Sequence, residues 1–141
     1  MRRVFVLFTA LLALSFLSGC VVNVRSVEAG TKAKDGSTYL GFDLNSKHRK
    51  DKDFTLVGAK LGKFSKFRLL VDHSPAHVKR VTLVFGNGDK WNVPLKKKFK
   101  RNTWSRWVDL PGGKRHIRKI VVVARGMKKK GRMPKLAYYA R

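Results

Sequence analysis

Short runs of alternating apolar and polar residues dominate the chain. Residues 81–85 and 91–95 each place every second apolar side chain on one face, which predicts two β-strands. Between them, Gly-Asn-Gly-Asp at residues 86–89 contains the Asn-Gly pair typical of a type I′ turn, whose two central residues need positive φ. We therefore expect a β-hairpin here. Because Pro94 has no backbone donor, its strand is expected at a sheet edge.

Five further apolar runs predict strands, at residues 54–57, 67–71, 106–110, 117–124 and 136–140. The run at 117–124 is apolar on both faces, so we expect a central strand that is covered on both sides. Ile117 and Ile120 cannot share one face under strict alternation, which predicts a β-bulge. These short strands, with no helical stripe after the N-terminal segment, predict an all-β domain. Its expected architecture is a single β-sandwich or jelly roll of about seven antiparallel strands.

The N-terminal segment has a different pattern. Arg2 and Arg3 precede an apolar stretch at residues 4–17, which is too short to span a bilayer but long enough for the core of an export signal. Leu-Ser-Gly-Cys at residues 17–20 has the pattern of a lipobox. We expect residues 1–19 to be a lipoprotein signal peptide and Cys20 to be lipidated. An uncleaved anchor helix is the simpler alternative.

Lipidation would also set the domain organisation and the location. Residues 20–38 offer little to bury and are expected to form a flexible tether after Cys20, followed by the β-sandwich domain at residues 39–141. Val21 replaces the Asp that retains enteric lipoproteins in the inner membrane. The expected location is therefore the cell envelope, on the periplasmic face of the outer membrane if the cell is Gram-negative. Because Cys20 is the only cysteine, no thiol is left for a disulfide or a metal.

Charge is the second strong signal. The chain holds 33 Lys and Arg against 8 Asp and Glu, and loss of Arg2 and Arg3 with the signal peptide leaves 31 against 8. Repulsion among these cations destabilises the compact state, which favours a polyanionic neighbour. Behind a lipobox, the expected partners are lipopolysaccharide, anionic lipid or an acidic wall polymer, and nucleic acid is disfavoured. A general solubility role is the alternative.

Three basic clusters form the candidate polyanion-binding site. Arg can bind a phosphate through two parallel hydrogen bonds, and Lys acts as a point charge. Three independent solvated loops are the alternative interpretation. The cations are Lys96, Lys97, Lys98, Lys100 and Arg101 in the first cluster; Lys114, Arg115, Arg118 and Lys119 in the second; and Lys128, Lys129, Lys130 and Arg132 in the third.

Tryptophans suggest a second kind of site, because an exposed indole can stack on a sugar ring. Trp107 is out of phase with Val108, so we expect it to face outward, whereas the phase of Trp91 places it in the core. Trp104 fits either environment. Arg106 lies between Trp104 and Trp107 in sequence, which suits cation–π packing.

No pattern in the sequence predicts catalysis, a cofactor or a metal site. Asp51 and Asp53 supply too few carboxylates for Ca²⁺ and are flanked by lysines. With one Glu and no nucleophile motif, we expect a protein that is not an enzyme. The four histidines do not have the spacing of a metal-binding motif; they are His48, His73, His77 and His116.

Four segments occur in an order that is similar to a known family. They are Asp-Lys-Asp at residues 51–53, Val-Thr-Leu-Val-Phe-Gly-Asn-Gly at 81–88, Ser-Arg-Trp-Val-Asp-Leu-Pro-Gly-Gly at 105–113 and Arg-His-Ile-Arg-Lys-Ile at 115–120. Together they make residues 51–125 resemble a bacterial family of exported β-sandwich domains, the domain of unknown function 2541. The resemblance implies an exported all-β domain and brings no catalytic residue. The excess of Lys and Arg departs from the family pattern.

The combined expectation is an envelope-anchored lipoprotein that binds polyanions through its basic clusters. Two alternatives stay open. One is a structural or assembly protein that docks an envelope protein partner, and the other is a glycan-binding module that uses Trp107 and Trp104.

Overall fold

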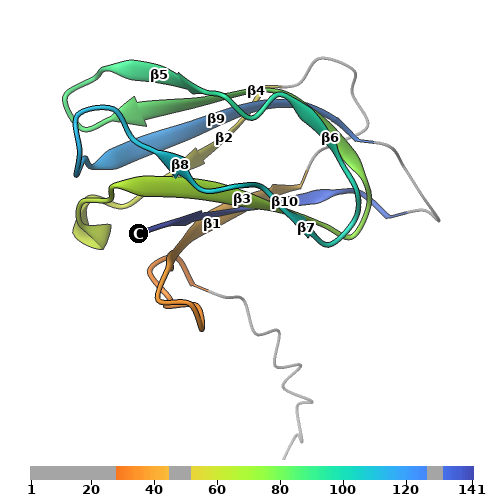
Figure 1. Ribbon diagram of the computed structural model, residues 1–141, viewed down its shortest axis with the longest axis horizontal. Coiled ribbons are helices and arrows are strands. Elements are labelled where there is room, and N and C mark those ends of the chain that lie inside the picture. The colour runs from red at the N-terminus through yellow and green to blue at the C-terminus, as the bar shows by residue number, and fades with distance from the viewer. Residues whose placement is uncertain (1–27, 45–51, 127–131) are drawn as a thin grey trace, which may run out of the picture.

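Two antiparallel sheets pack face to face in the computed structural model, which describes residues 28–44, 52–126 and 132–141 (Figure 1). The all-β sandwich expected from the alternating pattern is confirmed. Apart from one short 3₁₀ turn, η1 (Ala59–Leu61), the described residues form strands, turns and loops. Within them, no helix has the length and apolar character needed to cross a membrane.

Sheet A contains both the first and the last strand of the chain. Its path runs β1, β10, β3, β7, and β8 pairs with β3 beyond the end of β7. The bounds are β1 (Thr38–Leu44), β10 (Lys135–Ala140), β3 (Lys66–Asp72), β7 (Thr103–Trp104) and β8 (Val108–Asp109).

Sheet B is built on the two longest strands. Its path runs β2, β9, β4, β5, and β6 pairs with the opposite end of β4 from β5. The edge position expected of the strand before Pro94 is confirmed. The bounds are β2 (Lys52–Leu56), β9 (Ile117–Gly126), β4 (Ala76–Phe85), β5 (Lys90–Val93) and β6 (Lys97–Phe99).

The core lies between the sheets and follows the period of two. In β3, for example, Phe67, Leu69 and Val71 are buried completely while the residues between them are half-exposed. Burial of each such side chain contributes about 1.5–3 kcal/mol, which allows a disulfide-free domain of this size to fold against its own charge. Trp91 packs partly buried against this core, on the side its phase predicted.

The β4–β5 hairpin is confirmed, but the predicted turn type is wrong. Gly88 has φ +90°, whereas Asn87 is not among the described residues with positive φ. The Gly88 N–H donates to the Phe85 carbonyl and the Phe85 N–H donates to the Asp89 carbonyl, at 2.9 Å each. This is the three-residue loop with a left-handed glycine bulge. Only one positive-φ residue is needed, and Gly88 supplies it.

The bulge expected near Ile117 is also confirmed. Val84 pairs with Lys119 and Phe85 with Ile117, so Arg118 is the extra residue in β9. Both Ile117 and Ile120 are thereby buried. The expectation that β9 is covered on both faces is wrong, because Val121 and Val123 are only half-buried on the outer face. Their strand is central within the sheet, but no second layer of described residues covers it.

The described fold begins before Tyr39, which corrects the predicted boundary of the tether. The Gly30 N–H donates to the Tyr39 carbonyl (2.7 Å), and the Ala33 N–H donates to the Ser37 carbonyl (2.8 Å). Ser37 is fully buried. The segment from 28 to 37 therefore folds back on β1. Cys20 and the rest of residues 1–27 lie outside the described residues, as does Asp51.

Candidate anion-binding surfaces

The first basic cluster follows the edge strand β5 and includes β6. Phe99 and Leu95 are buried and hold this segment on the core, with 4% and 5% of their surface exposed. The cations between and after them face solvent: Lys96, Lys97, Lys98, Lys100 and Arg101. None takes part in the four ion pairs found between described residues, which use Lys66, Arg68, His73 and Arg115.

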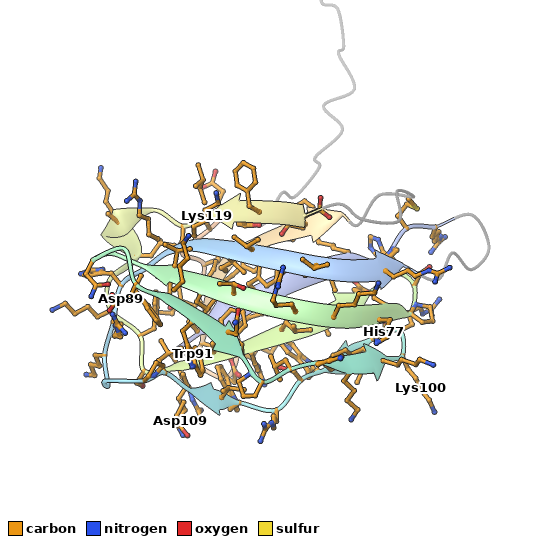
Figure 2. The ribbon with its side chains drawn as sticks, turned by 90° about the horizontal axis from the view of Figure 1, so that it is seen from above. His77, Asp89, Trp91, Lys100, Asp109 and Lys119 are labelled. Atoms are coloured by element: carbon orange, nitrogen blue, oxygen red, sulfur yellow. The ribbon has the colours of Figure 1, made fainter. Side chains whose placement is uncertain are left out.

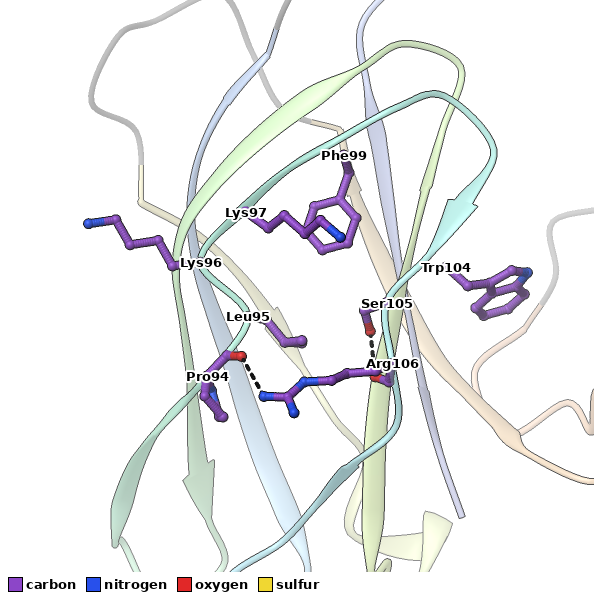
Figure 3. A pocket seen from close by; sticks show the side chains of 8 residues that line it. All are labelled: Pro94, Leu95, Lys96, Lys97, Phe99, Trp104, Ser105 and Arg106. Atoms are coloured by element: carbon purple, nitrogen blue, oxygen red, sulfur yellow. Dashed lines mark hydrogen bonds between the residues drawn. The ribbon is translucent and has the colours of Figure 1, made fainter.

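A small pocket of about 200 Å³ opens beside this cluster, between the β5–β6 segment of sheet B and residues 104–106 of sheet A (Figure 3). Lys96, Lys97 and Arg106 are the cations that line it, and the described lining contains no carboxylate. Arg106 reaches across the pocket, and its Nη2 donates to the Pro94 carbonyl at 3.4 Å. The remaining lining residues are Pro94, Leu95, Phe99, Trp104 and Ser105.

Ser105 fixes the far wall of this pocket to the sandwich. Its buried hydroxyl accepts a hydrogen bond from the Leu69 N–H (3.0 Å) and donates to the Arg106 carbonyl (2.9 Å). The Ser105 N–H donates to the Leu69 carbonyl (2.8 Å). Because the backbone of Ser105 and Arg106 is tied to β3, the Arg106 side chain extends from a fixed backbone position, which reduces the ordering cost of binding a compact anion.

The second cluster lies at the opposite end of β4. Lys114 and Arg118 are exposed, but Arg115 is engaged: its Nη2 contacts Asp89 Oδ2 (2.6 Å) and Asn87 Oδ1 (3.0 Å). The Arg115 guanidinium also lies 3.8 Å from the centroid of the Phe85 ring. Hydrogen bonds from Arg115 and Asn87 lower the pKa of Asp89 below its usual value. Arg115 therefore braces the β4–β5 turn and is less available to a ligand than its neighbours.

A shallow pocket of about 240 Å³ occurs at this second cluster. Phe85, Gly86, Asn87, Lys114, Arg115 and His116 line it. Lys119, the last member of the cluster, instead lies on the outer face of sheet B, with its Nζ 4.2 Å from the centroid of the Phe54 ring.

The third cluster is described only at Arg132, since Lys128, Lys129 and Lys130 lie outside the described residues. Arg132 is exposed, and its carbonyl accepts a hydrogen bond from the Ser74 hydroxyl (2.8 Å) just before β4.

The described clusters do not form one patch. The first cluster pairs with the start of β4, at Ala76–Val78, and Arg132 is bound near the same end. Residues 114–119 lie at the other end, where Ile117 pairs with Phe85. Ten residues of β4 separate the two ends by roughly 30 Å. Figure 2 shows this separation, with Lys100 and His77 toward one end and Asp89 toward the other. An elongated anion could contact both clusters, but a single phosphate could not.

The two candidate stacking residues, Trp104 and Trp107, lie on either side of Arg68 and not of Arg106. The Arg68 guanidinium carbon is 3.8 Å from the ring centroid of Trp104 and 4.3 Å from that of Trp107. Trp104 keeps 40% of its surface exposed, and Trp107 is half-buried and also contacts Arg141. At least one face of each indole is thus occupied within the described fold.

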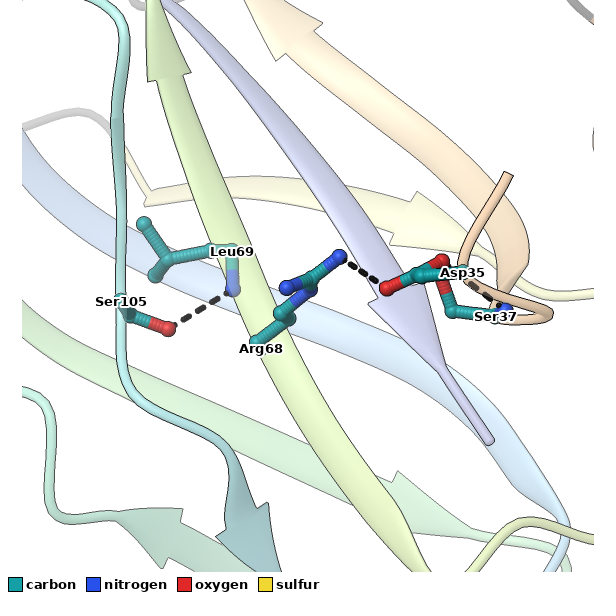
Figure 4. A network of polar contacts seen from close by, with 5 residues as sticks. All are labelled: Asp35, Ser37, Arg68, Leu69 and Ser105. Atoms are coloured by element: carbon teal, nitrogen blue, oxygen red, sulfur yellow. Dashed lines mark hydrogen bonds and ion pairs between the residues drawn. The ribbon is translucent and has the colours of Figure 1, made fainter. Parts of the chain in front are cut away.

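Arg68 is a residue at this surface to which no sequence pattern pointed. It bonds Asp35 in the segment before β1, and Asp35 in turn accepts hydrogen bonds from the hydroxyl and the N–H of Ser37 (Figure 4). These bonds, and then the charge of Arg68, hold the pKa of Asp35 below its usual value. A lone Arg in an alternating strand gives no signal of such a partner, because Asp35, Trp104 and Trp107 are distant in sequence.

Other acidic residues also have partners. Asp109 pairs with Lys66 (3.3 Å), and Asp72 lies 3.7 Å from the imidazole of His73. Asp43 accepts hydrogen bonds from Thr55 (2.8 Å) and Tyr138 (2.7 Å). The described residues contain no group of three His, Cys, Asp or Glu that could hold a metal ion.

The fold and these surfaces define a small all-β sandwich with a basic pocket beside the first cluster, and no described residue that lines this pocket carries a carboxylate. A family model described as domain of unknown function (DUF2541) matches residues 7–140, so the chain belongs to this family and the resemblance seen in the sequence is confirmed. No curated protein and no solved structure matched the chain.

Proposed function

We propose that this protein is an envelope-anchored lipoprotein whose sandwich binds anionic envelope components, either lipopolysaccharide, anionic lipid or an acidic wall polymer. The first basic cluster, with its neighbouring pocket, would be the principal contact. The same basic runs could also occur in three independent solvated loops that bind nothing. The proposal therefore depends on the spatial arrangement of the charges.

The observation that carries the proposal is the segregation of charge within the described residues. Most of the described carboxylates are used inside the fold, by Arg68, Arg115, Lys66 and neighbouring hydroxyls. The cations of the first cluster face solvent without such partners, and three cations surround one pocket. An anionic ligand would supply the missing countercharge, and Arg106 is positioned to bind one of its oxygens.

Neutralisation of the first cluster tests the proposal. Lys96→Gln, Lys97→Gln and Lys98→Gln together should weaken binding to lipopolysaccharide or anionic vesicles by about 100-fold at low salt, since each Lys contributes about 1 kcal/mol near an anionic surface. The dependence of affinity on salt should also become flatter. Vesicle co-sedimentation across a salt series measures both quantities.

A matched control separates the cluster from net charge. Lys34→Gln, Lys60→Gln and Lys63→Gln remove the same three charges from exposed positions elsewhere. An equal loss of affinity in the two triple variants would show that binding depends on net charge alone and that the first cluster is not a specific contact. Salt-insensitive binding to neutral sugars would instead support the glycan-binding alternative.

Anchoring is tested separately. Cys20→Ala should abolish incorporation of labelled fatty acid, because the thiol that would carry the lipid is removed. Undiminished labelling of the Cys20→Ala chain would disprove lipidation at this residue.

A further inference from the structure

The outer face of sheet B carries the most exposed large apolar side chains of the described residues. Leu56 and Phe54 on the edge strand β2 are 68% and 57% exposed. Phe54 pairs with Val121 of β9, and Val123 and Val84 extend the apolar surface across the sheet. Figure 2 looks onto this face, which no other described element covers.

Cations lie in the rows of outward residues on both sides of the row that contains Phe54. Lys119 lies beside Leu56, and Lys90 ends the same row on β5. Arg80 pairs with Val123 in the row next to that of Phe54 and Val121. Arg125 and Lys98 flank His77 at the far end of the sheet. At the outward positions of these strands, the described residues include no Asp or Glu. The face is therefore apolar at Phe54, Leu56, Val121 and Val123, and it is bordered by cations and by the neutral pair Thr82 and Asn92.

Sheet A differs in both respects. The segment from 28 to 37 folds back on β1, and Tyr39, on the same outer face as Tyr139, is 4% exposed. Asp35 and Asp109 pair with Arg68 and Lys66, so these two cations on sheet A already have countercharges.

We propose that the outer face of sheet B rests on an anionic bilayer surface, with Phe54 and Leu56 inserted among the lipids and the surrounding cations bound to headgroup phosphates. Apolar side chains alone would fit a protein partner, and cations alone would fit any soluble polyanion. The two together, on one open face, match the chemistry of a membrane interface. This inference rests on the proposed function and specifies one of its ligand classes and the surface that binds it.

The reach of the expected anchor permits this orientation. Seven residues lie between Cys20 and Glu28, where the described fold begins, and the eight residue-to-residue steps span up to ~28 Å when extended. The backbones of two packed sheets lie only about 10 Å apart, so a chain that leaves on the side of sheet A can reach past sheet B.

The test uses the chain from residue 20 with Cys20→Ser, so that no acyl chain contributes to binding. Its partners are vesicles of phosphatidylcholine, vesicles with about one-third phosphatidylglycerol, and inorganic polyphosphate as a soluble polyanion. The double variant Phe54→Ser, Leu56→Ser should weaken binding to the anionic vesicles by about 10- to 100-fold. The reason is that most of the apolar surface of these two side chains would no longer be transferred from water into lipid. Polyphosphate binding should not change.

Phe42→Ser is the matched control. Phe42 is 42% exposed on sheet A, and the Nζ of Lys135 lies 4.3 Å from its ring, as that of Lys119 lies 4.2 Å from Phe54. This variant should bind all three partners like the parent chain. An equal loss from Phe42→Ser would overturn the assignment to sheet B.

A direct reading of contact comes from labelled cysteines. The Cys20→Ser chain has no other cysteine, so an environment-sensitive dye can be attached through Leu56→Cys or Phe42→Cys. Anionic vesicles should shift the emission of the dye at residue 56 toward the blue and leave that at residue 42 unchanged.

Two failures are distinguishable. If the parent chain binds polyphosphate but the vesicles leave both dyes unchanged, sheet B is not a membrane surface and the proposed function survives. If the parent chain binds neither polyphosphate nor anionic vesicles at low salt, the proposed function fails and this inference fails with it.

Discussion

At the scale of single residues, Arg68 connects more parts of the fold than any described basic residue of the three clusters. Its guanidinium lies between two indoles and pairs with Asp35 from the segment before β1, while 16% of its side chain is exposed. Its Nε is buried and has no hydrogen-bond acceptor among the described residues. The planar cation is therefore held mainly by stacking and by one carboxylate, and a change in its shape should matter as much as a change in its charge.

Arg68→Ala should lower the free energy of unfolding by about 2–3 kcal/mol, since two partly desolvated cation–π contacts and one half-exposed ion pair are lost. Arg68→Lys should cost about half as much, because the charge remains without the flat stacking surface. Urea unfolding monitored by tryptophan fluorescence measures both. The control Arg101→Ala, at an exposed site, should be neutral; the same result for Arg68→Ala would show that the stack contributes nothing.

Tyr39 should make the fold sensitive to high pH. Burial, and then the proximity of Tyr139 and Asp43, raises the pKa of Tyr39 to about 12 from its usual 10. The unfolded chain loses this proton first, so the contribution is fully present below pH 10 and is lost as pH rises toward 12. The loss amounts to roughly 2–3 kcal/mol.

Urea midpoints of the parent chain and Tyr39→Phe between pH 8 and 11.5 test this dependence on pH. The stability difference between the two chains should shift in favour of Tyr39→Phe above pH 10, because phenylalanine has no proton to lose. Parallel curves would assign the alkaline loss to other tyrosines or to lysines.

At the scale of elements, a bulge in β1 brings the two sheets close together at one corner. Tyr39 pairs with Tyr139 and Gly41 with Tyr138, so Leu40 is the extra residue and turns into the core. Gly41 has φ +135°, and a Cβ there would lie 2.8 Å from Thr55 Cγ2 on β2 of the other sheet. Only glycine satisfies both the backbone and the space.

Gly41→Ala should therefore destabilise the domain by about 2–4 kcal/mol, from backbone strain and overpacking together. Gly58→Ala is the control, because Gly58 has φ −64° and an added Cβ would meet nothing within 4 Å. Thermal unfolding of both chains checks this prediction. A similar melting temperature in both would show that β1 can relax around the new methyl group.

Local patterns predicted seven of the ten described strands, because a period of two can be read from consecutive residues; β1, β6 and β7 were not predicted. The β4–β5 hairpin and the Arg118 bulge depend on neighbours alone, and both were predicted. The turn type failed because Asn-Gly is compatible with more than one loop and Gly88 alone takes positive φ. The partners of Arg68 and the cover on β1 involve residues far apart in the chain, and alternation carries no information about such contacts.

The candidate site was predictable to the same limited extent. The sequence identifies cations by their runs, and the first cluster is exposed as a run of this kind should be. It does not reveal that Arg115 braces a turn, since Asn87 and Asp89 meet Arg115 only through pairing of β4 with β9. The exposed Phe54 and Leu56 were assigned to an ordinary strand, because alternation identifies two faces without stating which face remains open.

At the scale of the whole molecule, the balance of charge opposes folding. The full chain carries +25, and the described cations extend over both ends of sheet B and its outer face. At 0.01 M salt the screening length is about 30 Å, comparable with the length of β4, so the two ends repel each other. At 0.15 M it falls to about 8 Å, and only neighbouring cations still interact.

Salt should therefore stabilise the protein. Between 0.01 and 0.3 M KCl, the melting temperature of the chain from residue 20 with Cys20→Ser should rise by about 5 °C, which corresponds to roughly 1 kcal/mol for a domain of this size. The few exposed ion pairs, such as Lys66–Asp109, weaken with salt but contribute little. Replacement of Lys96, Lys97 and Lys98 by glutamine should reduce the rise.

Polyphosphate at equal ionic strength should raise the melting temperature further, because a ligand that binds only the folded state adds its binding free energy to the effect of screening. A fall with KCl would show that ion pairs outweigh repulsion, and the charge would then need no anionic neighbour to be tolerated.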